Sequence, residues 1–343
     1  MNPLNGISRL FHLRTACANW RHGAHKGLLT LSLLGALTAA HALDLQGHRG
    51  ARGLAPENTL PGFETALAIG VNTLELDIGV TADDEVVISH DPYLNPAITR
   101  DASGVWLKTR GPDLRSLTLA QLQTYDVGRI NPDSPYAKAL STQQPVDGAR
   151  VPTLAALFAR VKVLGADKVR FNIETKINPT RPDDTVNAER MTRLLLNVIR
   201  EAGMLQRVTI QSFDWRTLQI VQGFEPGVPT VYLSIQTANT DNIKDGLWTA
   251  GFKIADHGSV PKLVKAAGGT VWSPNGGAVT EALVKEAHAL GIKVIPWTLN
   301  NPDDMQRLID WGVNGLITDY PDRLRAVMQV RALPLPPPTP GKT

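Results

Sequence analysis

Cysteine is nearly absent from this 343-residue chain: the single one, Cys17, lies in an N-terminal segment that we expect to be removed. The remaining chain therefore cannot form a disulfide, bind a metal through thiolates or use a cysteine nucleophile. Acidic residues are also missing from the first 42 positions, which contain the bases Arg9, Arg14, Arg21 and Lys26. Charge of one sign at the start of a chain is typical of a targeting segment.

Residues 1–42 have the layout of a secretory signal peptide. Their basic stretch is followed by an apolar run at 28–37, and Ala40-His41-Ala42 is a small-x-small cleavage pattern. The apolar run is too short for a full membrane span, and a retained membrane anchor is the alternative. We therefore predict export across the inner membrane to the periplasm, with no stable membrane span after cleavage.

Removal of this segment changes the charge of the protein. The whole chain has 35 Lys and Arg residues against 32 Asp and Glu, whereas the part after position 42 has 31 against 32, a net charge of −1. The excess of bases therefore belongs to the targeting segment. We expect no basic stripe on the folded protein and no nucleic-acid partner.

From Asp44 onward, short β-rich runs alternate with longer helical patterns. The expected strands are residues 43–48, 73–80, 169–176, 208–213, 230–235, 270–275, 293–299 and 315–319. The expected helices are residues 59–69, 153–164, 186–202, 215–222, 260–267, 280–290 and 302–311. Eight strands with intervening helices predict an α/β fold, a closed (β/α)8 TIM-type barrel over residues 43–330. A doubly wound open sheet is the alternative, but no glycine-rich dinucleotide or Walker fingerprint follows any strand.

Two stretches depart from this alternation. Residues 93–150 are rich in Pro, Asp, Gly and Ser, and their one helix signal is the capping-box spacing Thr118-x-x-Gln121. A segment of that length between barrel elements is expected to be an insertion after the second strand region, over the active face. Residues 331–343 are Pro-rich and are predicted to be a disordered tail.

Acidic residues alternate with apolar ones on two of the expected strands. Glu75 and Asp77 are two residues apart, as are Glu174 and Lys176, so each pair shares one face of its strand. Inward carboxylates are costly unless they are paired or bound to a cation. Three such acids suit Mg²⁺ or Ca²⁺. A structural salt bridge, with Lys176 and Arg49 neutralising the acids, is the alternative that spacing alone leaves open.

Two histidines, His48 and His90, end strand-like runs. A lone histidine at such a position would favour a structural role, but the neighbouring acids favour a catalytic one. An imidazole with an ordinary pKa can donate and accept protons around neutral pH. We expect the nearby acids to keep at least one of the two histidines protonated at neutral pH.

The motif His48-Arg49-Gly50-Ala51-Arg52-Gly53-Leu54-Ala55-Pro56-Glu57-Asn58-Thr59 resembles the opening motif of the glycerophosphodiester phosphodiesterases. Further pieces follow in the order of that family: Glu75-x-Asp77, Thr81-x-Asp83, Ser89-His90-Asp91, Asn172-Ile173-Glu174-Thr175-Lys176, Gln211-Ser212-Phe213, Pro296-Trp297-Thr298 and Thr318-Asp319-Tyr320-Pro321. Each piece is weak alone, but the ordered set, from about residue 46 to residue 323, is specific.

The resemblance implies a barrel whose site lies at the C-terminal ends of the strands. It implies an acid/base pair, His48 and His90; ligands for one divalent cation, Ca²⁺ or Mg²⁺, at Glu75, Asp77 and Glu174; and phosphate contacts from Arg49 and Lys176. We also regard Gln211 as a candidate hydrogen-bonding residue near the site. Trp297 is a candidate wall of the glycerol pocket, with a core position as the alternative.

The reaction implied by the resemblance is hydrolysis of glycerophosphodiesters to glycerol 3-phosphate and an alcohol. By family analogy it would pass through a cyclic glycerol phosphate, which water then opens. We favour His90 as the acid that protonates the leaving alcohol, although the sequence does not determine which histidine is the base.

Two other functions stay open. A phospholipase acting on lysolipids or intact lipids would need an apolar rim on the active face, for which the insertion offers only scattered candidates. A catalytically silent barrel that only binds its ligand is disfavoured, because a binder gains little from buried like charges. The sequence does not determine whether the protein forms a homo-oligomer.

Overall fold

The structure is a computed structural model that describes residues 42–339. The predicted signal peptide therefore lies outside the described residues, apart from its last position. Among the described helices, none combines the length and the apolar character needed to cross a membrane.

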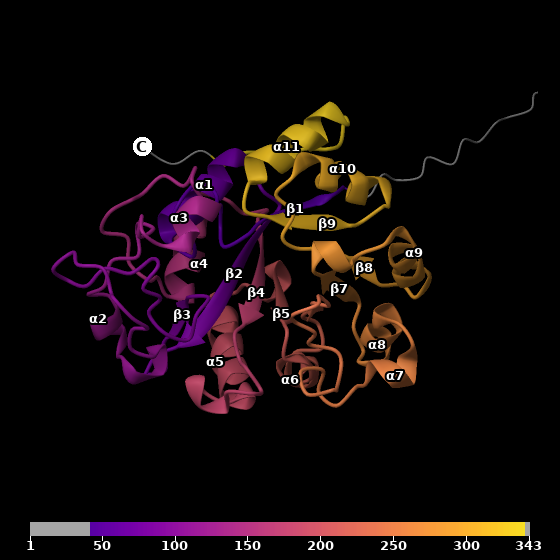
Figure 1. Ribbon diagram of the computed structural model, residues 1–343, viewed down its shortest axis with the longest axis horizontal. Helices are drawn as coiled ribbons and strands as arrows, with labels where there is room; N and C mark the ends of the chain where they lie inside the picture. The colour runs from indigo at the N-terminus through magenta and orange to yellow at the C-terminus, as the bar shows by residue number, and fades with distance from the viewer. Residues whose placement is uncertain (1–41, 340–343) are drawn as a thin grey trace, which may run out of the picture. The chain divides into compact units, whose positions relative to one another are not determined.

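Eight parallel strands form a nearly closed barrel, which confirms the predicted (β/α)8 fold (Figure 1). They are β1 (Asp44–Gly47), β2 (Thr73–Val80), β4 (Arg170–Thr175), β5 (Val208–Ser212), β6 (Thr230–Ser234), β7 (Val271–Pro274), β8 (Lys293–Val294) and β9 (Gly315–Thr318). The hydrogen-bonded order is β8-β7-β6-β5-β4-β2-β1-β9. Backbone hydrogen bonds from Asn314 to Val294 (2.8 Å) and from Ile317 to Pro296 (3.0 Å) link the two end strands. The doubly wound alternative is therefore wrong.

Helices connect successive strands around the barrel (Figure 1). The principal ones are α1 (Leu60–Ile69), α4 (Leu154–Val163), α5 (Ala188–Glu201), α6 (Trp215–Phe224), α8 (Val260–Ala266), α9 (Glu281–Ala289), α10 (Pro302–Asp310) and α11 (Pro321–Val330). A short α7 (Ile254–His257) and 3-10 turns at Pro182–Asp184, Leu205–Arg207 and Gly276–Ala278 complete the connections. Side-chain caps define several helix starts: the Thr59 hydroxyl, for example, accepts from the Gly62 N–H at the first turn of α1.

The alternation on β2 separates the apolar core from the site. Leu74, Leu76 and Ile78 have no exposed surface and belong to the large apolar cluster that includes side chains of the surrounding helices. Because successive side chains of a strand point to opposite faces, Glu75 and Asp77 point into the barrel. Apolar packing outside the barrel thus holds two carboxylates inside it.

The insertion after the short antiparallel strand β3 (Val86–Ile88) is a folded unit rather than a loose loop. It contains a 3-10 turn (Leu114–Ser116), α2 (Leu119–Leu122) and α3 (Pro135–Ala139), and both hydrogen bonds of the predicted capping box form at the start of α2. Four of its buried apolar side chains form a separate small cluster together with two flanking residues: Val87, Leu94, Leu114, Leu122, Val127 and Val151.

The insertion packs on the loop that follows β1. The Thr142 hydroxyl donates to the Gly53 carbonyl at 2.7 Å, and the Gln143 amide donates to the Arg52 carbonyl at 2.8 Å. The guanidinium of Arg52 also lies over the ring of Tyr136, 5.6 Å from its centroid. This loop carries His48, so the insertion borders the mouth of the barrel.

The described part of the Pro-rich tail has no regular secondary structure after α11. It nevertheless contacts the barrel: the Thr339 N–H donates to the Leu67 carbonyl at 2.8 Å, and Arg325 donates to the Pro336 carbonyl at 2.7 Å. Disorder of residues 331–343 in solution stays a prediction.

Candidate active site

Three acids converge at the carboxyl ends of β2 and β4. Asp77 and Glu174 are direct partners in the register of these two strands, and Glu75 lies two residues earlier on the same face as Asp77. All three are buried, and each offers a carboxylate oxygen within 4.8 Å of the others. The predicted convergence of the three acids on one point is therefore present.

The acids are only partly paired with cationic side chains. Arg49 Nε lies 3.2 Å from Asp77 Oδ2, and Lys176 Nζ lies 2.8 Å from Glu174 Oε1. Among the described residues, no Lys or Arg side chain pairs with Glu75, which instead accepts from the Arg49 backbone N–H at 2.9 Å and from Gln211 Nε2 at 2.6 Å. The salt-bridge alternative thus accounts for two of the three carboxylates.

Acidic side chains outnumber basic ones around the three acids. The carboxylates of this region are Glu57, Glu75, Asp77, Glu174 and Asp319, and the Lys and Arg side chains that contact them are Arg49, Arg52 and Lys176. An anionic phosphodiester would add further negative charge. Oxygen donors with uncompensated charge are the environment that a hard divalent cation requires.

Burial controls the protonation of the acids. Burial, followed by the charge of Asp77, raises the pKa of Glu75 well above its usual range. Burial also raises the pKa of Glu174 to about 7, against the opposing effect of Lys176. For Asp77, burial would raise the pKa, but Arg49, His90 and Lys176 outweigh it and hold the pKa far below the usual range. The protein alone therefore stabilises the negative charge of Asp77, whereas burial disfavours that of Glu75 and, despite Lys176, that of Glu174.

A tight loop after β1 places His48 and Arg49. Arg49 has a left-handed backbone (φ 47°), which points its N–H at Glu75, and Gly50 follows with φ 87°. A Cβ on Gly50 would lie 2.7 Å from the backbone carbon of Gly62 in α1. Glycine is needed here both for the dihedral angle and for the close approach of the loop to the helix.

His48 is oriented by an acid from the opposite end of the chain. Its Nδ1 lies 2.5 Å from Asp319 Oδ1, and its Nε2 lies 3.9 Å from Glu75 Oε2. Asp319 follows β9 and also accepts from Asn300 at 2.7 Å and from Arg52 at 3.3 Å. An ionised Asp319 can only accept, so Nδ1 carries the proton and the Nε2 lone pair faces the acids.

His90 follows β3 and lies on the other side of the acids. Its Nδ1 lies 3.0 Å from Asp91 Oδ1, and it lines a cavity with Glu174 and Lys176. Burial, followed by the charges of Arg49 and Lys176, lowers the pKa of His90 to about 4. Burial also lowers the pKa of His48, although Asp319 opposes it. Our expectation of a histidine kept protonated by the acids is therefore wrong for the protein without bound ligands, because desolvation outweighs the acids.

The other predicted site residues lie at or below this cluster. Arg49 donates from Nη1 to Glu57 at 2.8 Å as well as contacting Asp77. Gln211 is buried under the acids and faces Glu75 rather than open space. Trp297 is half-buried, donates from Nε1 to the Ser273 carbonyl and packs edge-on against the ring of Phe213, 5.3 Å away.

Several residues of the site were not assigned a role from the sequence. Arg52 contacts Asp319, Glu57 contacts Arg49, and Asn58 contacts Asp77. Asp91 contacts His90, and Asp319 contacts His48. All five belong to the motifs that carry the family resemblance, and Asp319 is the final residue of the last expected strand. A charged residue at the carboxyl end of a barrel strand is the signal that could have identified Asp319.

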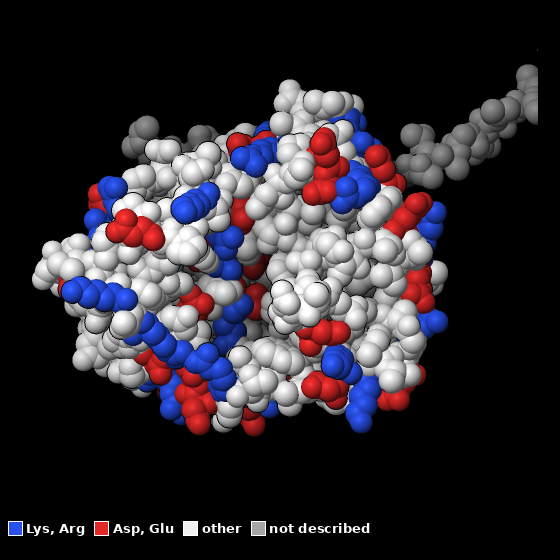
Figure 2. Space-filling model, in the orientation of Figure 1, with Lys and Arg blue, Asp and Glu red and all other residues white. Residues whose placement is uncertain are grey.

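A cavity of about 430 Å³ extends outward from His90, Glu174 and Lys176. The apolar and aromatic side chains along it are Pro92, Tyr93, Ile177, Phe213, Ile235 and Trp248. Figure 2 shows acidic and basic side chains inside a hollow near the middle of the face that is drawn there. The site thus combines a charged centre with an apolar extension.

Comparisons with known proteins agree with this geometry. The family model that matches, over residues 48–323, is that of the glycerophosphoryl diester phosphodiesterase family. A glycerophosphodiester phosphodiesterase from Bacillus subtilis (strain 168) is 30% identical over 290 residues, which cover 82% of this chain and 84% of the relative.

Solved structures show the same fold. A protein from Silicibacter pomeroyi DSS-3, provisionally assigned as a glycerophosphoryl diester phosphodiesterase, has a TM-score of 0.77 and 34% identity, covering 85% of this chain and 95% of that one. A phosphodiesterase from Oleispira antarctica, solved in complex with the product sn-glycerol-3-phosphate, has a TM-score of 0.60 and 20% identity, covering 84% and 97%. Because the family match spans nearly the whole barrel, this chain belongs to the glycerophosphoryl diester phosphodiesterase family and is a phosphoric diester hydrolase.

Proposed function

We propose that this enzyme hydrolyses glycerophosphodiesters to glycerol 3-phosphate and an alcohol, with one divalent cation, Ca²⁺ or Mg²⁺, held by Glu75, Asp77 and Glu174. The observation that carries the proposal is the buried cluster of three acids, in which Glu75 has no cationic partner among the described residues. The product bound to the Oleispira antarctica relative supports glycerol 3-phosphate as the product here.

The residues around the cation site are suited to an anionic substrate. A bound divalent cation would supply electrostatic stabilisation of the charge that develops on the phosphoryl oxygens. Lys176 and Arg49 are the nearest fixed positive charges, and we assign them contacts to the phosphate. Trp297 and Phe213 form an aromatic corner that would border the glycerol.

The two histidines would move the protons. A glycerol hydroxyl oxygen bonds to phosphorus as the bond to the departing alcohol breaks, which yields a cyclic glycerol phosphate. His48 Nε2, with its lone pair exposed by the bond to Asp319, accepts the hydroxyl proton. His90 donates a proton to the departing alcohol, and water then opens the ring. An anionic substrate next to His90 would raise its pKa and so allow it to carry that proton.

The composition of the N-terminal segment supports export of the enzyme. Residues 1–42 combine a basic stretch, an apolar run and a small-x-small cleavage pattern. We therefore infer that the mature enzyme works in the periplasm on small diesters that reach this compartment. Immunodetection of the enzyme in a periplasmic fraction, with a processed N-terminus, would support this inference; an unprocessed chain in the cytoplasm would contradict it.

The function is tested by product release from a defined substrate. Purified protein incubated with glycerophosphocholine should release glycerol 3-phosphate, lose this activity with EDTA and regain it with Ca²⁺ or Mg²⁺. The variant His48→Ala should lose the activity while it still binds the cation. Wild-type turnover in His48→Ala would refute the acid/base assignment, and no product with any metal or diester would favour a silent binding barrel.

The apolar cavity favours a second candidate, cleavage of lysolipids. The rim of apolar side chains that such a substrate requires on the active face is supplied by residues of the loops after β4, β5 and β6, such as Ile177, Phe213 and Trp248, and not by the insertion. Because the cavity starts at His90 and Lys176, a chain attached to the phosphodiester could lie in it. Trp248→Ser should lower kcat/KM for lysophosphatidylcholine but not for glycerophosphocholine; equal effects on both substrates would remove this candidate.

A further inference from the structure

Three buried amide side chains form a hydrogen-bonded chain inside the barrel. Asn172 of β4 donates to Gln46 of β1 at 3.0 Å and to Gln211 of β5 at 2.9 Å. Gln211 in turn donates to Glu75 at 2.6 Å. The three amides are at most 2% exposed, so water does not compete for these bonds.

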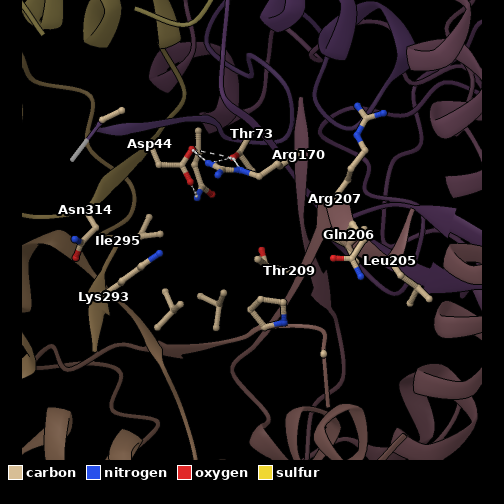
Figure 3. Close-up of a pocket in the computed structure, with 17 residues that line it drawn as sticks. Asp44, Thr73, Arg170, Leu205, Gln206, Arg207, Thr209, Lys293, Ile295 and Asn314 are labelled. Atoms are coloured by element: carbon tan, nitrogen blue, oxygen red, sulfur yellow. Dashed lines mark hydrogen bonds and ion pairs between the residues drawn. The ribbon is translucent and has the colours of Figure 1, made fainter. Parts of the chain in front are cut away.

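The far end of the chain is anchored at the amino ends of the strands. Gln46 donates to Asp44 Oδ2 at 3.0 Å, and Asp44 also accepts from Thr73 at 2.8 Å and pairs with Arg170 at 3.0 Å. Figure 3 shows Asp44, Thr73 and Arg170 together at the edge of a cavity lined by the first residues of several strands. The hydrogen-bonded amides therefore connect the amino ends of the strands to the three acids.

The direction of every hydrogen bond in the chain is determined by its ends. Ionised carboxylates only accept, so Gln46 must turn its NH₂ to Asp44, and Gln211 must turn its NH₂ to Glu75 when Glu75 is ionised, as it would be with a cation bound. Both amides then present oxygens to Asn172, which can satisfy them because its NH₂ group has two hydrogens. The Thr209 hydroxyl donates to Asn172 Oδ1 at 2.9 Å and holds this orientation.

We propose that Gln46, Asn172 and Gln211 are positioning residues that fix the rotamer of Glu75 and thereby set the affinity of the three-acid site for a divalent cation. Asn172 is the central member, because its NH₂ group donates to Gln46 on one side and to Gln211 on the other. Its side chain contacts none of the three acids. Partners that orient metal ligands are worth about 10- to 100-fold in metal affinity. This inference rests on the proposed cation site.

The test is Mn²⁺ binding to the purified full chain, followed by the EPR signal of free Mn²⁺. Asn172→Leu removes the donor to Gln211 at nearly constant volume, and Asn172→Ser removes it with less apolar bulk, should the first variant not fold. Gln46→Leu removes only the more distant link. Thr192→Val is the matched control, because it deletes a buried hydrogen bond to Ala188 within α5, outside the barrel interior.

We expect the Mn²⁺ dissociation constant to rise about tenfold or more in the folded Asn172 variant, less in Gln46→Leu and not at all in Thr192→Val. If the wild-type protein binds one Mn²⁺ and a folded Asn172 variant binds it with the same affinity, the positioning role is refuted while the cation site stands. Absence of Mn²⁺ binding in the wild-type protein would instead refute the cation site, and the positioning role with it.

Discussion

His48 and Asp319 lie 271 positions apart in the chain, yet their side chains meet at 2.5 Å at the carboxyl ends of β1 and β9. These two strands are the first and the last of the barrel, and they pair directly in the sheet. The contact fixes which nitrogen of His48 carries its proton and leaves Nε2 facing Glu75. The pairing of the first and last strands thus brings together the two residues on which the proposed role of His48 depends.

Asp319→Asn tests this contact. The amide removes the ionised acceptor that orients His48, so we expect kcat to fall about 100-fold or more, as for other histidine-orienting carboxylates. Cation affinity, measured by Mn²⁺ titration, should stay unchanged because Asp319 is not one of the three acids. Asp322→Asn, at an exposed position in α11, is the control. Unchanged kcat in Asp319→Asn would contradict the orienting role.

Glu75→Gln should stabilise the metal-free protein more than Glu174→Gln does. Glu75 has a raised pKa and no cationic partner among the described residues, so its burial costs stability at pH 7, and Gln should raise the free energy of unfolding by about 1 to 3 kcal/mol. Burial raises the pKa of Glu174 as well, but Glu174→Gln leaves Lys176 without its carboxylate partner at 2.8 Å, so its gain in the free energy of unfolding should be smaller.

The sign follows from proton binding. A carboxyl whose folded pKa is raised binds more protons in the folded than in the unfolded state, so its penalty is present at pH 7 and disappears towards pH 4. Urea unfolding in EDTA at both pH values measures this. Added Ca²⁺ should stabilise the wild type and neither variant. A destabilised Glu75→Gln protein at pH 7 would contradict the assignment of Glu75 as the uncompensated acid.

Gly50→Ala tests the loop that places His48. The added Cβ would lie 2.7 Å from the Gly62 backbone, and residue 50 has a left-handed backbone conformation. We therefore expect the free energy of unfolding to fall by about 2 kcal/mol or more and the activity to fall at least tenfold. Gly104→Ala has a similar φ (80°), but no atom of residues 42–339 beyond its chain neighbours lies within 4 Å of the added Cβ. Its free energy of unfolding should fall by only about 1 kcal/mol, and its activity should stay unchanged. Equal activity losses in both variants would refute the role of the close approach.

His90 should make the metal-free protein less stable in acid. Its pKa is about 4 in the folded protein and 6.5 otherwise, so between these values the unfolded chain binds the extra proton. Between pH 7 and pH 4 the free energy of unfolding of the wild type should therefore fall by up to about 3 kcal/mol more than that of His90→Gln. Parallel pH series of urea unfolding in EDTA measure the difference. Identical pH dependence in the two proteins would show that His90 is not desolvated.

The strands were predictable because each one combines a short β-rich run with a distinct local boundary. The two-residue period of β2 also placed Glu75 and Asp77 on one face without any coordinates. Asp319 had no comparable signal for its partner, since the contact with His48 depends on closure between the first and last strands. The final helix, α11, was not among the predicted elements.

Charge states were the least predictable feature of the site. The sequence places acids near both histidines, which predicts protonation. Burial of His90 and the nearby charges of Arg49 and Lys176 outweigh the acids, and this balance depends on distances that the sequence does not contain. The amide chain from Gln46 to Glu75 is likewise visible only when four strands are in register.

The most direct test of the account is an anomalous difference map from a crystal of the wild-type enzyme soaked in Mn²⁺. We predict one strong peak within coordination distance, about 2.0–2.6 Å, of carboxylate oxygens from Glu75, Asp77 and Glu174. A map without a peak at this position, with Lys176 and Arg49 still paired to the acids, would contradict the central claim.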